Sequence, residues 1–231
     1  MMLTFSVIIP ALNEEKGIGH CIAAVWALAP EVEVIVVDGG SEDGTVQVVQ
    51  QTGAMLCHSA QGRGPQCNAG ARAASGEVLL FLHADTFLPA QAFDLLQTTF
   101  QEARVQVAKF QIQFDQYHWT LATCAKFSRF DTILTSFGDQ GIVVRRPFFD
   151  HIGGFPNWPI YEDVRFFQQA RRHTRVHVLP AQVTSSARRF VEGGFYRQLL
   201  RNLTFMGRYL LGVTPQRIAE LYEPSNQRGR Q

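Results

Sequence analysis

Residues 77–86, EVLLFLHADT, decide the fold of this chain. The apolar run 78–82 has the length and composition of a strand buried on both faces, as in a parallel sheet. It ends abruptly at His83, and Asp85 follows, so we expect an imidazole and a carboxylate at the carboxyl end of the strand. Ligands bind at this edge of open α/β sheets. The two side chains would point to the same side of an extended chain, and a simple helix-capping role for Asp85 stays open.

The rest of the chain repeats strand and helix, which places it in the α/β class. Such alternation predicts a mostly parallel sheet with right-handed crossovers. The hydrophobic patterns predict strands at 5–9, 32–37, 54–58, 78–82, 105–114, 141–145 and 175–179. They predict helices at 14–28, 44–52, 65–74, 90–102, 117–134 and 164–172.

Length and charge bound the class of protein. A chain of 231 residues, 46% of them hydrophobic, can bury one substantial core. The formal net charge is +1, but residues 1–100 carry 3 Lys/Arg and 10 Asp/Glu, whereas residues 171–231 carry 11 Arg and 3 Glu. The first part suits a bound metal ion, and the last part suits a phosphate or an anionic surface. Because the first half is acidic, we expect no nucleic-acid partner.

Residues 194–211 have the pattern of an amphipathic helix. The apolar stripe comprises Phe195, Leu199, Leu203, Met206 and Leu210. The opposite face carries Arg197, Arg201, Thr204 and Arg208. Packing on the chain's own domain and peripheral contact with a membrane surface both stay open for this helix.

The cysteines and the N-terminus bear on the compartment. Cys21, Cys57, Cys67 and Cys124 show no CxxC spacing and no His at zinc-site intervals, so we expect reduced thiols of a cytosolic protein. The first residues lack a signal-peptide pattern, and no run reaches membrane-spanning length. The expected location is cytoplasmic, with peripheral attachment to the inner face of the membrane as the alternative.

Polar clusters also follow the first two predicted strands. In 10–14, PALNE, Asn13 and Glu14 can cap the next helix or contact a ligand. In 37–45, VDGGSEDGT, Asp38 can accept hydrogen bonds from a ribose or a base edge while glycine keeps the backbone close to the ligand. An ordinary turn explains Asp38 equally well.

A glycine-rich segment, 62–70 (GRGPQCNAG), precedes the predicted strand 78–82. Its glycines let backbone amides approach an anion, Arg63 adds positive charge, and the following helix offers its N-terminus to phosphate. It matches neither the Walker pattern nor the dinucleotide fingerprint. Together the clusters describe a nucleoside diphosphate across the sheet edge, with a divalent ion on its phosphates.

In this combination, residues 6–86 resemble the nucleotide-binding half of the inverting family 2 glycosyltransferases of the GT-A fold. The resemblance rests on the VIIPALNE start, the VVDGGS turn, the glycine-rich segment leading into NAG, and the strand that ends in the metal motif. It continues more loosely to about residue 180. It implies a three-layer GT-A sandwich at 1–190, with nucleotide-sugar binding at 1–89, the acceptor side at 90–190, and a C-terminal helical extension at 191–231.

The resemblance implies roles for individual residues. Nucleotide contacts are expected from Pro10, Ala11, Asn13, Glu14, Asp38, Gly39, Gly62, Arg63, Asn68 and Ala84. Asp85 would ligate Mn²⁺ or Mg²⁺. The family usually shows Asp-x-Asp, and here the first position is His83, a ligand that suits Mn²⁺ better than Mg²⁺. Metal ligation by Asp85 alone, with His83 on a phosphate, stays open.

Downstream, 137–141 (FGDQG) and 153–164 (GGFPNWPIYEDV) resemble the acceptor segment of the family. An acidic pair at the head of a helix can simply complement the helix dipole. The resemblance implies that Asp163 is the general base, with Glu162 as the second choice. It places Asp139 and Gln140 near the sugar or the acceptor.

The predicted function is inverting, metal-dependent transfer of a sugar from a nucleoside diphosphate sugar to an acceptor hydroxyl or a lipid phosphate. The sequence identifies neither the sugar nor the acceptor, and it leaves a homodimer open. A sugar-1-phosphate nucleotidyltransferase is one alternative, but 10–14 lacks its Gly-rich loop with Arg or Lys. A non-catalytic nucleotide-sugar binding module is another, and the presence of Glu162 and Asp163 argues against it.

Overall fold

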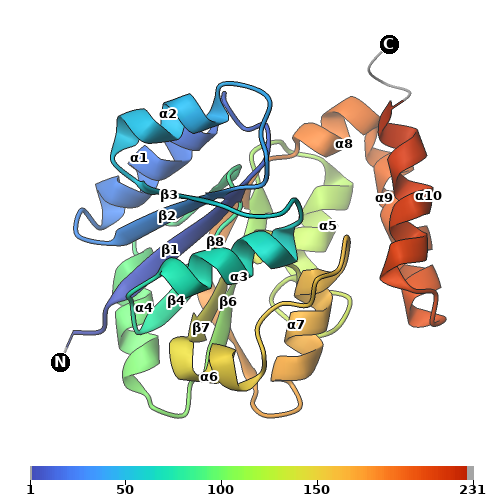
Figure 1. The fold of residues 1–231 in the computed structure, drawn as a ribbon. Coiled ribbons are helices and arrows are strands. Elements are labelled where there is room, and N and C mark those ends of the chain that lie inside the picture. The colour runs from blue at the N-terminus through green and yellow to red at the C-terminus, as the bar shows by residue number, and fades with distance from the viewer. Residues whose placement is uncertain (1, 228–231) are drawn as a thin grey trace.

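The computed structural model describes residues 2–227 of the chain. It has a central sheet covered by helices on both faces, with the helices α9 (Phe195–Leu210) and α10 (Pro215–Gln227) standing beside this sandwich (Figure 1). The α/β class, the GT-A-like three layers and the C-terminal helical extension are therefore as predicted. Over the described residues, no helix combines the length and the apolar character needed to cross a membrane.

Within residues 2–227, eight strands form one sheet in the order β3-β2-β1-β4-β7-β6-β8-β5. The strands are β1 (Phe5–Ala11), β2 (Glu33–Asp38), β3 (Met55–His58), β4 (Val78–Phe81), β5 (Thr86–Phe87), β6 (Val107–Phe114), β7 (Ile142–Arg145) and β8 (Val176–Ser185). Strands β1 to β4 pair in parallel, as do β6 and β8, whereas β7 and β5 pair antiparallel to their neighbours. The carboxyl ends of β1, β2 and β4 therefore meet at one edge.

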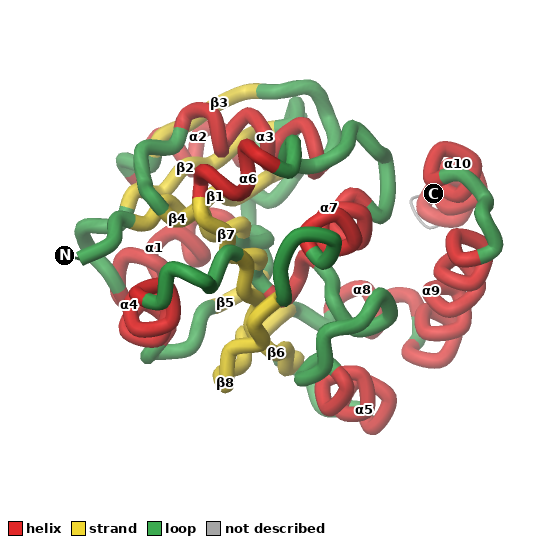
Figure 2. The backbone as a smooth tube through the Cα atoms, turned by 90° about the horizontal axis from the view of Figure 1, so that it is seen from below, coloured by secondary structure: helices red, strands yellow, loops and turns green. Residues whose placement is uncertain are grey.

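The helices cover the two faces of this sheet. They are α1 (Ile18–Leu28), α2 (Thr45–Thr52), α3 (Arg63–Ala73), α4 (Ala92–Gln101), α5 (Trp119–Phe127), α6 (Arg146–His151), α7 (Glu162–Ala170) and α8 (Arg188–Gly193), with a 3₁₀ turn at Gly138–Gln140. Figure 2 shows α1 and α4 on one side of the strands and α3 and α6 on the other.

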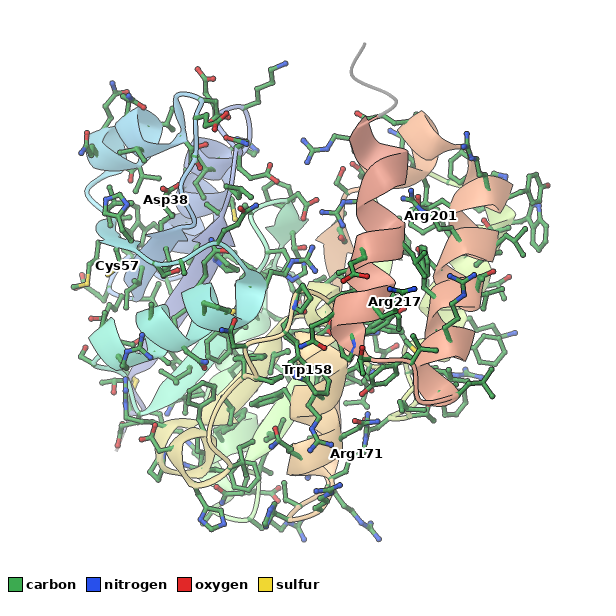
Figure 3. The ribbon with its side chains drawn as sticks, turned by 45° about the vertical axis from the view of Figure 1, so that its right-hand side comes forward. Asp38, Cys57, Trp158, Arg171, Arg201 and Arg217 are labelled. Carbon is green, nitrogen blue, oxygen red and sulfur yellow. The ribbon has the colours of Figure 1, made fainter. Side chains whose placement is uncertain are left out.

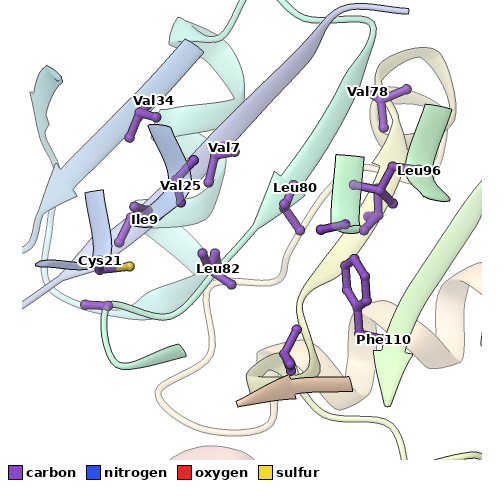
Figure 4. Close-up of a cluster of buried hydrophobic side chains, with 14 of the residues drawn as sticks. Val7, Ile9, Cys21, Val25, Val34, Val78, Leu80, Leu82, Leu96 and Phe110 are labelled. Carbon is purple, nitrogen blue, oxygen red and sulfur yellow. The ribbon is translucent and has the colours of Figure 1, made fainter. Parts of the chain in front are cut away.

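Alternate residues of the strands build the two cores. Val7 and Ile9 face one helical layer, together with Leu96 of α4, whereas Ile8 faces the other layer and packs with Phe166 of α7. Figure 4 shows the first of these clusters between the sheet and its helices. Because side chains alternate across a strand, runs that are apolar at every position bury both faces.

Some predicted boundaries were wrong for local reasons. The helix predicted at 117–134 ends at Phe127, because the Ser128 hydroxyl donates to Ala125 O and accepts from Ile112 N, which ties this point to β6. The strand predicted at 175–179 continues to Ser185 because it pairs with both β6 and β5. The helix α6 and the short strand β5 were not predicted, and α8 and α10 were covered only by the predicted helical extension 191–231, without bounds of their own.

The C-terminal helices pack on the sandwich through one face of α9. The Tyr209 ring packs against that of Tyr161 at a tilt of 41°, with ring centroids 4.9 Å apart, and its hydroxyl donates to Gln168 Oε1 of α7 at 3.0 Å. The predicted apolar stripe divides here, because Met206 is buried while Leu203 and Leu210 are exposed. Residues 228–231 of the predicted extension 191–231 lie outside the described part.

Candidate active site

The loops after β1 and β2 are tied together at the carboxyl edge of the sheet. Asn13 N donates to Ser41 Oγ at 2.9 Å, and Glu42 N donates to Asn13 Oδ1 at 2.9 Å. Asn13 has φ 55°, in the left-handed region that Asn tolerates better than most residues. Ala11 pairs in register with Asp38, so the predicted nucleotide-side residues of both strands share this edge.

Asp38 closes the turn after β2. Its carboxylate accepts from Gly40 N at 2.9 Å and from Ser41 N, and its side chain is 3% exposed. His58 Nδ1 lies 3.6 Å from Asp38 Oδ2. Burial by itself would raise the pKa of Asp38, but the hydrogen bonds from Ser41 and Gly40, with His58 nearby, lower it. The carboxylate is therefore held ionised and fixed in orientation.

The buried side chain of Gln66 joins the ends of β1 and β2 by hydrogen bonds, a role that its position in the sequence did not reveal. Its Nε2 donates to Ala11 O at 2.7 Å and to Val37 O at 2.8 Å. A Cβ at Gly39 would meet this amide at 3.0 Å, so glycine is needed there for close packing. Buried amide hydrogen bonds of this kind hold the turn rigid under a ligand.

Four carboxyl groups act electrostatically on the guanidinium of Arg63: those of Glu162, Asp163, Asp139 and Asp85. Arg63 Nη1 lies 3.9 Å from Glu162 Oε1, and its charge is also felt by Asp163, Asp139 and Asp85. Burial and the charge of Asp163 raise the pKa of Glu162 to about 7. Burial and the charges of Asp163 and Asp85 raise the pKa of Asp139 to about 6. Arg63, and for Asp139 also Arg189, oppose these rises without cancelling them, so the raised pKa values indicate an excess of negative charge in this cluster.

Asp163 is oriented by two backbone donors. Its Oδ2 accepts from Gly138 N at 2.6 Å, and its Oδ1 accepts from Val164 N at 2.7 Å. A Cβ at Gly138 would meet His83 Nε2 at 3.0 Å and Asp163 Oδ2 at 3.2 Å. His83, the Gly138 backbone and Asp163 are therefore packed against one another, beside a small pocket of about 10 Å³.

The segment before α7 holds a strained residue. Tyr161 precedes Glu162 with φ 63°, a left-handed conformation that is rare for a bulky side chain. It sets the direction in which the helix begins, so that Glu162 is buried against α3 while Asp163 faces Gly138. Such strain is concentrated at functional sites.

His83 and Asp85 do not lie on an extended chain as predicted. Thr86 N donates to His83 O at 3.1 Å, so the backbone turns at Ala84 and Asp85 directly after β4. Burial and the positive charges of Arg63 and Arg189 keep the pKa of His83 well below its usual value, so its imidazole is neutral.

Glu14 lies on the Asp85 side of the edge and pairs with the C-terminal part of the chain. Arg188 Nη2 of α8 lies 3.4 Å from Glu14 Oε1. Burial raises the pKa of Glu14, with Arg188 opposing the rise and Asp85 adding to it. The start of α8 is therefore part of the rim of the site, in agreement with the prediction that the arginine-rich last part of the chain suits a phosphate.

The remaining predicted nucleotide residues take different positions. Pro10 lines the small pocket with Arg63 and His83, whereas Ala84 is buried in the core. Gly62 caps α3 with φ 128°. The Asn68 amide is committed to the backbone of Phe155, donating to its O at 2.8 Å and accepting from its N at 3.0 Å.

A buried lysine anchors the segment that carries Asp139 and Gln140. Lys109 of β6 is 0% exposed, and its Nζ donates to Ser128 O, Phe130 O and Thr135 O at 2.8–3.0 Å and to Gln140 Oε1 at 2.9 Å. Burial lowers the pKa of Lys109 to about 8. The Gln140 amide thus points into the interior, next to Asp139 in the site.

The residues at this edge fit a hard divalent cation whose coordination would be completed by oxygen atoms of a bound diphosphate. Asp139 Oδ1 is buried without a hydrogen-bond partner among the described residues, and Asp85 and Asp163 add negative charge around it. Over residues 2–227, no group of three or more His, Cys, Asp or Glu side chains is arranged to hold a metal. Mg²⁺ is commonly held by one or two carboxylates plus substrate phosphates, so a larger protein cage is not required.

Comparison with known proteins bears on the family and the fold of this chain. The model of the family described as glycosyl transferase family 2 matches residues 6–158. The chain belongs to glycosyl transferase family 2. This family 2 chain is 30% identical, over 143 residues, to a 4,4'-diaponeurosporenoate glycosyltransferase of Staphylococcus aureus. The match covers 58% of the chain and 37% of that relative, so the chain matches well under half of the relative's length.

Solved structures share the fold of this family 2 chain. Staphylococcus aureus TarS (residues 1–349) in complex with UDP-GlcNAc matches 80% of the chain and 58% of its own, with 24% identity and a TM-score of 0.64. The Pyrobaculum calidifontis mannosyltransferase PcManGT, in complex with GDP-Man and Mn²⁺, matches 94% of the chain and 67% of its own, with 21% identity and a TM-score of 0.67. At these identities the likeness establishes the fold.

Proposed function

We propose that this family 2 protein transfers a sugar from a nucleoside diphosphate sugar to an acceptor hydroxyl or lipid phosphate, with inversion at the anomeric carbon. The observation that supports it most is the excess of negative charge around Arg63, where the pKa values of Asp139 and Glu162 are raised and one Asp139 oxygen is buried without a partner. Carboxylates crowded in this way suit a bound cation and a base.

The donor would lie across the carboxyl edge of β1, β2 and β4. Asp38 would meet the ribose or the base edge, as the ionised carboxylate fixed at the end of β2. The loops of Pro10 and Asn13 flank it. The pocket of about 10 Å³ beside His83 and Asp163 has room for about one water, so the sugar would lie above it.

The leaving diphosphate needs positive charge. Arg63, whose side chain is 42% exposed, can reach a phosphate from the start of α3, and the helix N-terminus adds to its effect. A divalent cation held by Asp85, with His83 or Asp139 nearby, would neutralise the charge that develops on the diphosphate. The relatives PcManGT and Mycobacterium tuberculosis glucosyl-3-phosphoglycerate synthase have been solved with Mn²⁺ and Mg²⁺ respectively, which supports such a cation here.

Asp163 is proposed as the general base that removes the proton of the acceptor hydroxyl. Hydrogen bonds from two backbone N–H groups fix its carboxylate where it lines the small pocket. Glu162 is the second choice, because it is buried and its pKa of about 7 lies near neutral pH. A correctly placed base contributes roughly 10² to 10⁴ in rate.

The test measures release of nucleoside diphosphate from a panel of UDP- and GDP-sugars, with water as acceptor, with and without Mn²⁺. We expect metal-dependent release that Asp85→Ala abolishes. Asp163→Ala should lower the rate by roughly 10²-fold or more, because the attacking oxygen keeps its proton, while nucleoside diphosphate binding measured by calorimetry stays unchanged. The exposed Asp150→Ala on α6 serves as the control.

The alternatives give different results in the same assay. A nucleotidyltransferase would release pyrophosphate from a nucleoside triphosphate and a sugar 1-phosphate. A binding module would bind the nucleotide sugar without turnover. Unchanged turnover by Asp163→Ala would contradict its assignment as the base.

A further inference from the structure

The helix α9 and its C-cap residue Leu211 expose a stripe of apolar side chains to solvent. Its members are each more than half exposed and recur along one face of the helix: Tyr196 (63%), Leu200 (67%), Leu203 (61%), Leu210 (51%) and Leu211 (87%). At a rise of 1.5 Å per residue the stripe is about 22 Å long. Single exposed leucines are ordinary on a protein surface, whereas a contiguous stripe marks a binding surface.

The stripe is not the face by which α9 packs on its own domain. That packing uses the other side of the helix, where Gln198, Phe205 and Met206 are buried and Tyr209 bonds to α7. One face of α9 is therefore covered by the domain, and a second, apolar face is exposed to solvent.

A row of arginines runs along one edge of the stripe. Arg197, Arg201 and Arg208 line a groove of about 350 Å³ with Thr204 on α9 and Leu221 on α10. Figure 3 shows Arg201 and Arg217 on this helical pair, apart from Asp38 in the body of the sandwich. The sequence of α9, FYRQLLRNLTFMGRYL, contains three arginines and no acidic residue.

Aromatic side chains extend the stripe at its N-terminal end. Trp119 of α5 is 57% exposed, and its Nε1 donates to the Tyr196 hydroxyl at 3.2 Å. Tyr117, just before α5, is also exposed. Trp and Tyr prefer the boundary between lipid headgroups and acyl chains.

We propose that this surface of α9 and the start of α5 binds the face of a bilayer that contains anionic phospholipids. The leucines would enter the boundary between headgroups and acyl chains, and the exposed Arg197 and Arg208 would meet lipid phosphates. A second copy of the chain is a poorer occupant, because pairing two such helices brings arginine rows together without acidic residues from α9. A nucleic acid would use the arginines and leave the leucines in water.

Lipid binding would also bring the bilayer close to the site. The chain leaves β8, pairs Arg188 with Glu14 at the rim, and reaches Phe195 of α9 through the single short helix α8. The proposal itself does not depend on sugar transfer, because it concerns where the protein binds and not which reaction it performs.

The test is co-sedimentation of the full chain with vesicles of phosphatidylcholine alone and of phosphatidylcholine with about 30% phosphatidylglycerol. We expect binding to the anionic vesicles that weakens as NaCl is raised, because the arginine contribution is screened by salt. Leu200→Ser/Leu203→Ser/Leu210→Ser should weaken binding more than about tenfold through lost apolar burial. Arg197→Gln/Arg208→Gln should weaken it roughly twenty-five-fold, at about fivefold per arginine.

Matched controls lie elsewhere on the surface. Met55→Ser removes an exposed apolar side chain from β3, and Arg172→Gln/Arg175→Gln removes two exposed charges between α7 and β8. Both should bind as the unchanged protein does. Every variant should retain nucleoside diphosphate binding, so a loss of lipid binding is separated from a failure of the proposed site or of folding.

Two results would overturn the proposal. One is the absence of sedimentation of the unchanged protein with anionic vesicles. The other is a dimer in light scattering that the leucine variant converts to a monomer, together with vesicle binding that this variant retains in full.

Discussion

Two charged groups on neighbouring elements of the fold, β6 and the 3₁₀ turn Gly138–Gln140, have opposite surroundings. Lys109 is enclosed by four oxygen acceptors, so the protein itself satisfies its ammonium. Asp139, next to one of those acceptors in the sequence, shares its space with Asp85 and Asp163 and has an oxygen without a partner among the described residues. A buried charge that is paired within the protein supports structure, whereas one left unpaired calls for a ligand.

A single 3₁₀ turn connects the two charged groups. The same 3₁₀ turn, Gly138–Gln140, carries Asp139 toward the site and Gln140 toward Lys109. Its first residue donates its backbone N–H to Asp163. Lys109 therefore fixes the turn through Gln140, and the turn in its place orients the proposed base Asp163 through the backbone N–H of Gly138.

The largest expected effect comes from removing the satisfied charge. Lys109→Met should lower the free energy of unfolding by about 3–5 kcal/mol, because it leaves buried carbonyls and the Gln140 amide oxygen without their donor. Urea denaturation measures this loss. Lys126→Met, at an exposed position on α5, should change stability by less than about 0.5 kcal/mol. A loss below about 1 kcal/mol at Lys109 would mean that the ammonium is not the anchor of the 128–140 segment.

A smaller effect of opposite sign is expected at the unsatisfied charge. Asp139→Asn should raise the free energy of unfolding by about 1–2 kcal/mol at pH 8, because it relieves repulsion from Asp163 and Asp85. Nucleoside diphosphate release should fall in the same variant. Thermal unfolding measures the expected gain in stability, and the release assay measures the expected loss of activity. Asp150→Asn, on the surface of α6, serves as the control. A destabilised Asp139→Asn would contradict the excess of negative charge.

The smallest effect, taken per pH unit, is the pH dependence of the unliganded protein. The pKa values of Asp139 and Glu162 are raised in the fold to about 6 and about 7, above their ordinary values of 3.8 and 4.5. Between about pH 4 and pH 7 the folded state therefore binds more protons than the unfolded chain, and stability falls as pH rises. Lys109, with its pKa lowered to about 8, makes the opposite contribution above pH 8.

Thermal unfolding at pH 5, 6, 7 and 8 measures this slope, which we expect to average about 1 kcal/mol per pH unit. Asp139→Asn should flatten the lower part of the curve and leave the part near pH 7 to Glu162. A flat curve in the unchanged protein would show that the acidic cluster is neutralised within the protein.

Local patterns in the sequence predicted most elements that fill the two cores. The apolar run 78–82 corresponds to β4 (Val78–Phe81), and the strand and helix alternation before it corresponds to β1 through α3. These elements could be predicted because hydrophobic periodicity is a local property. Helix α6 was missed because its six residues are too few to show a period.

The sequence by itself determined the α/β class, the family and the acidic and basic halves of the chain, because each is set by residue type and local spacing. Tertiary structure alone decided which side chains meet: Lys109 with the 128–140 segment, Arg63 with Glu162, and Gly138 with Asp163. No local period records contacts between residues so far apart. It also decided which apolar face of α9 is left in water, since amphipathicity does not say which face the domain covers.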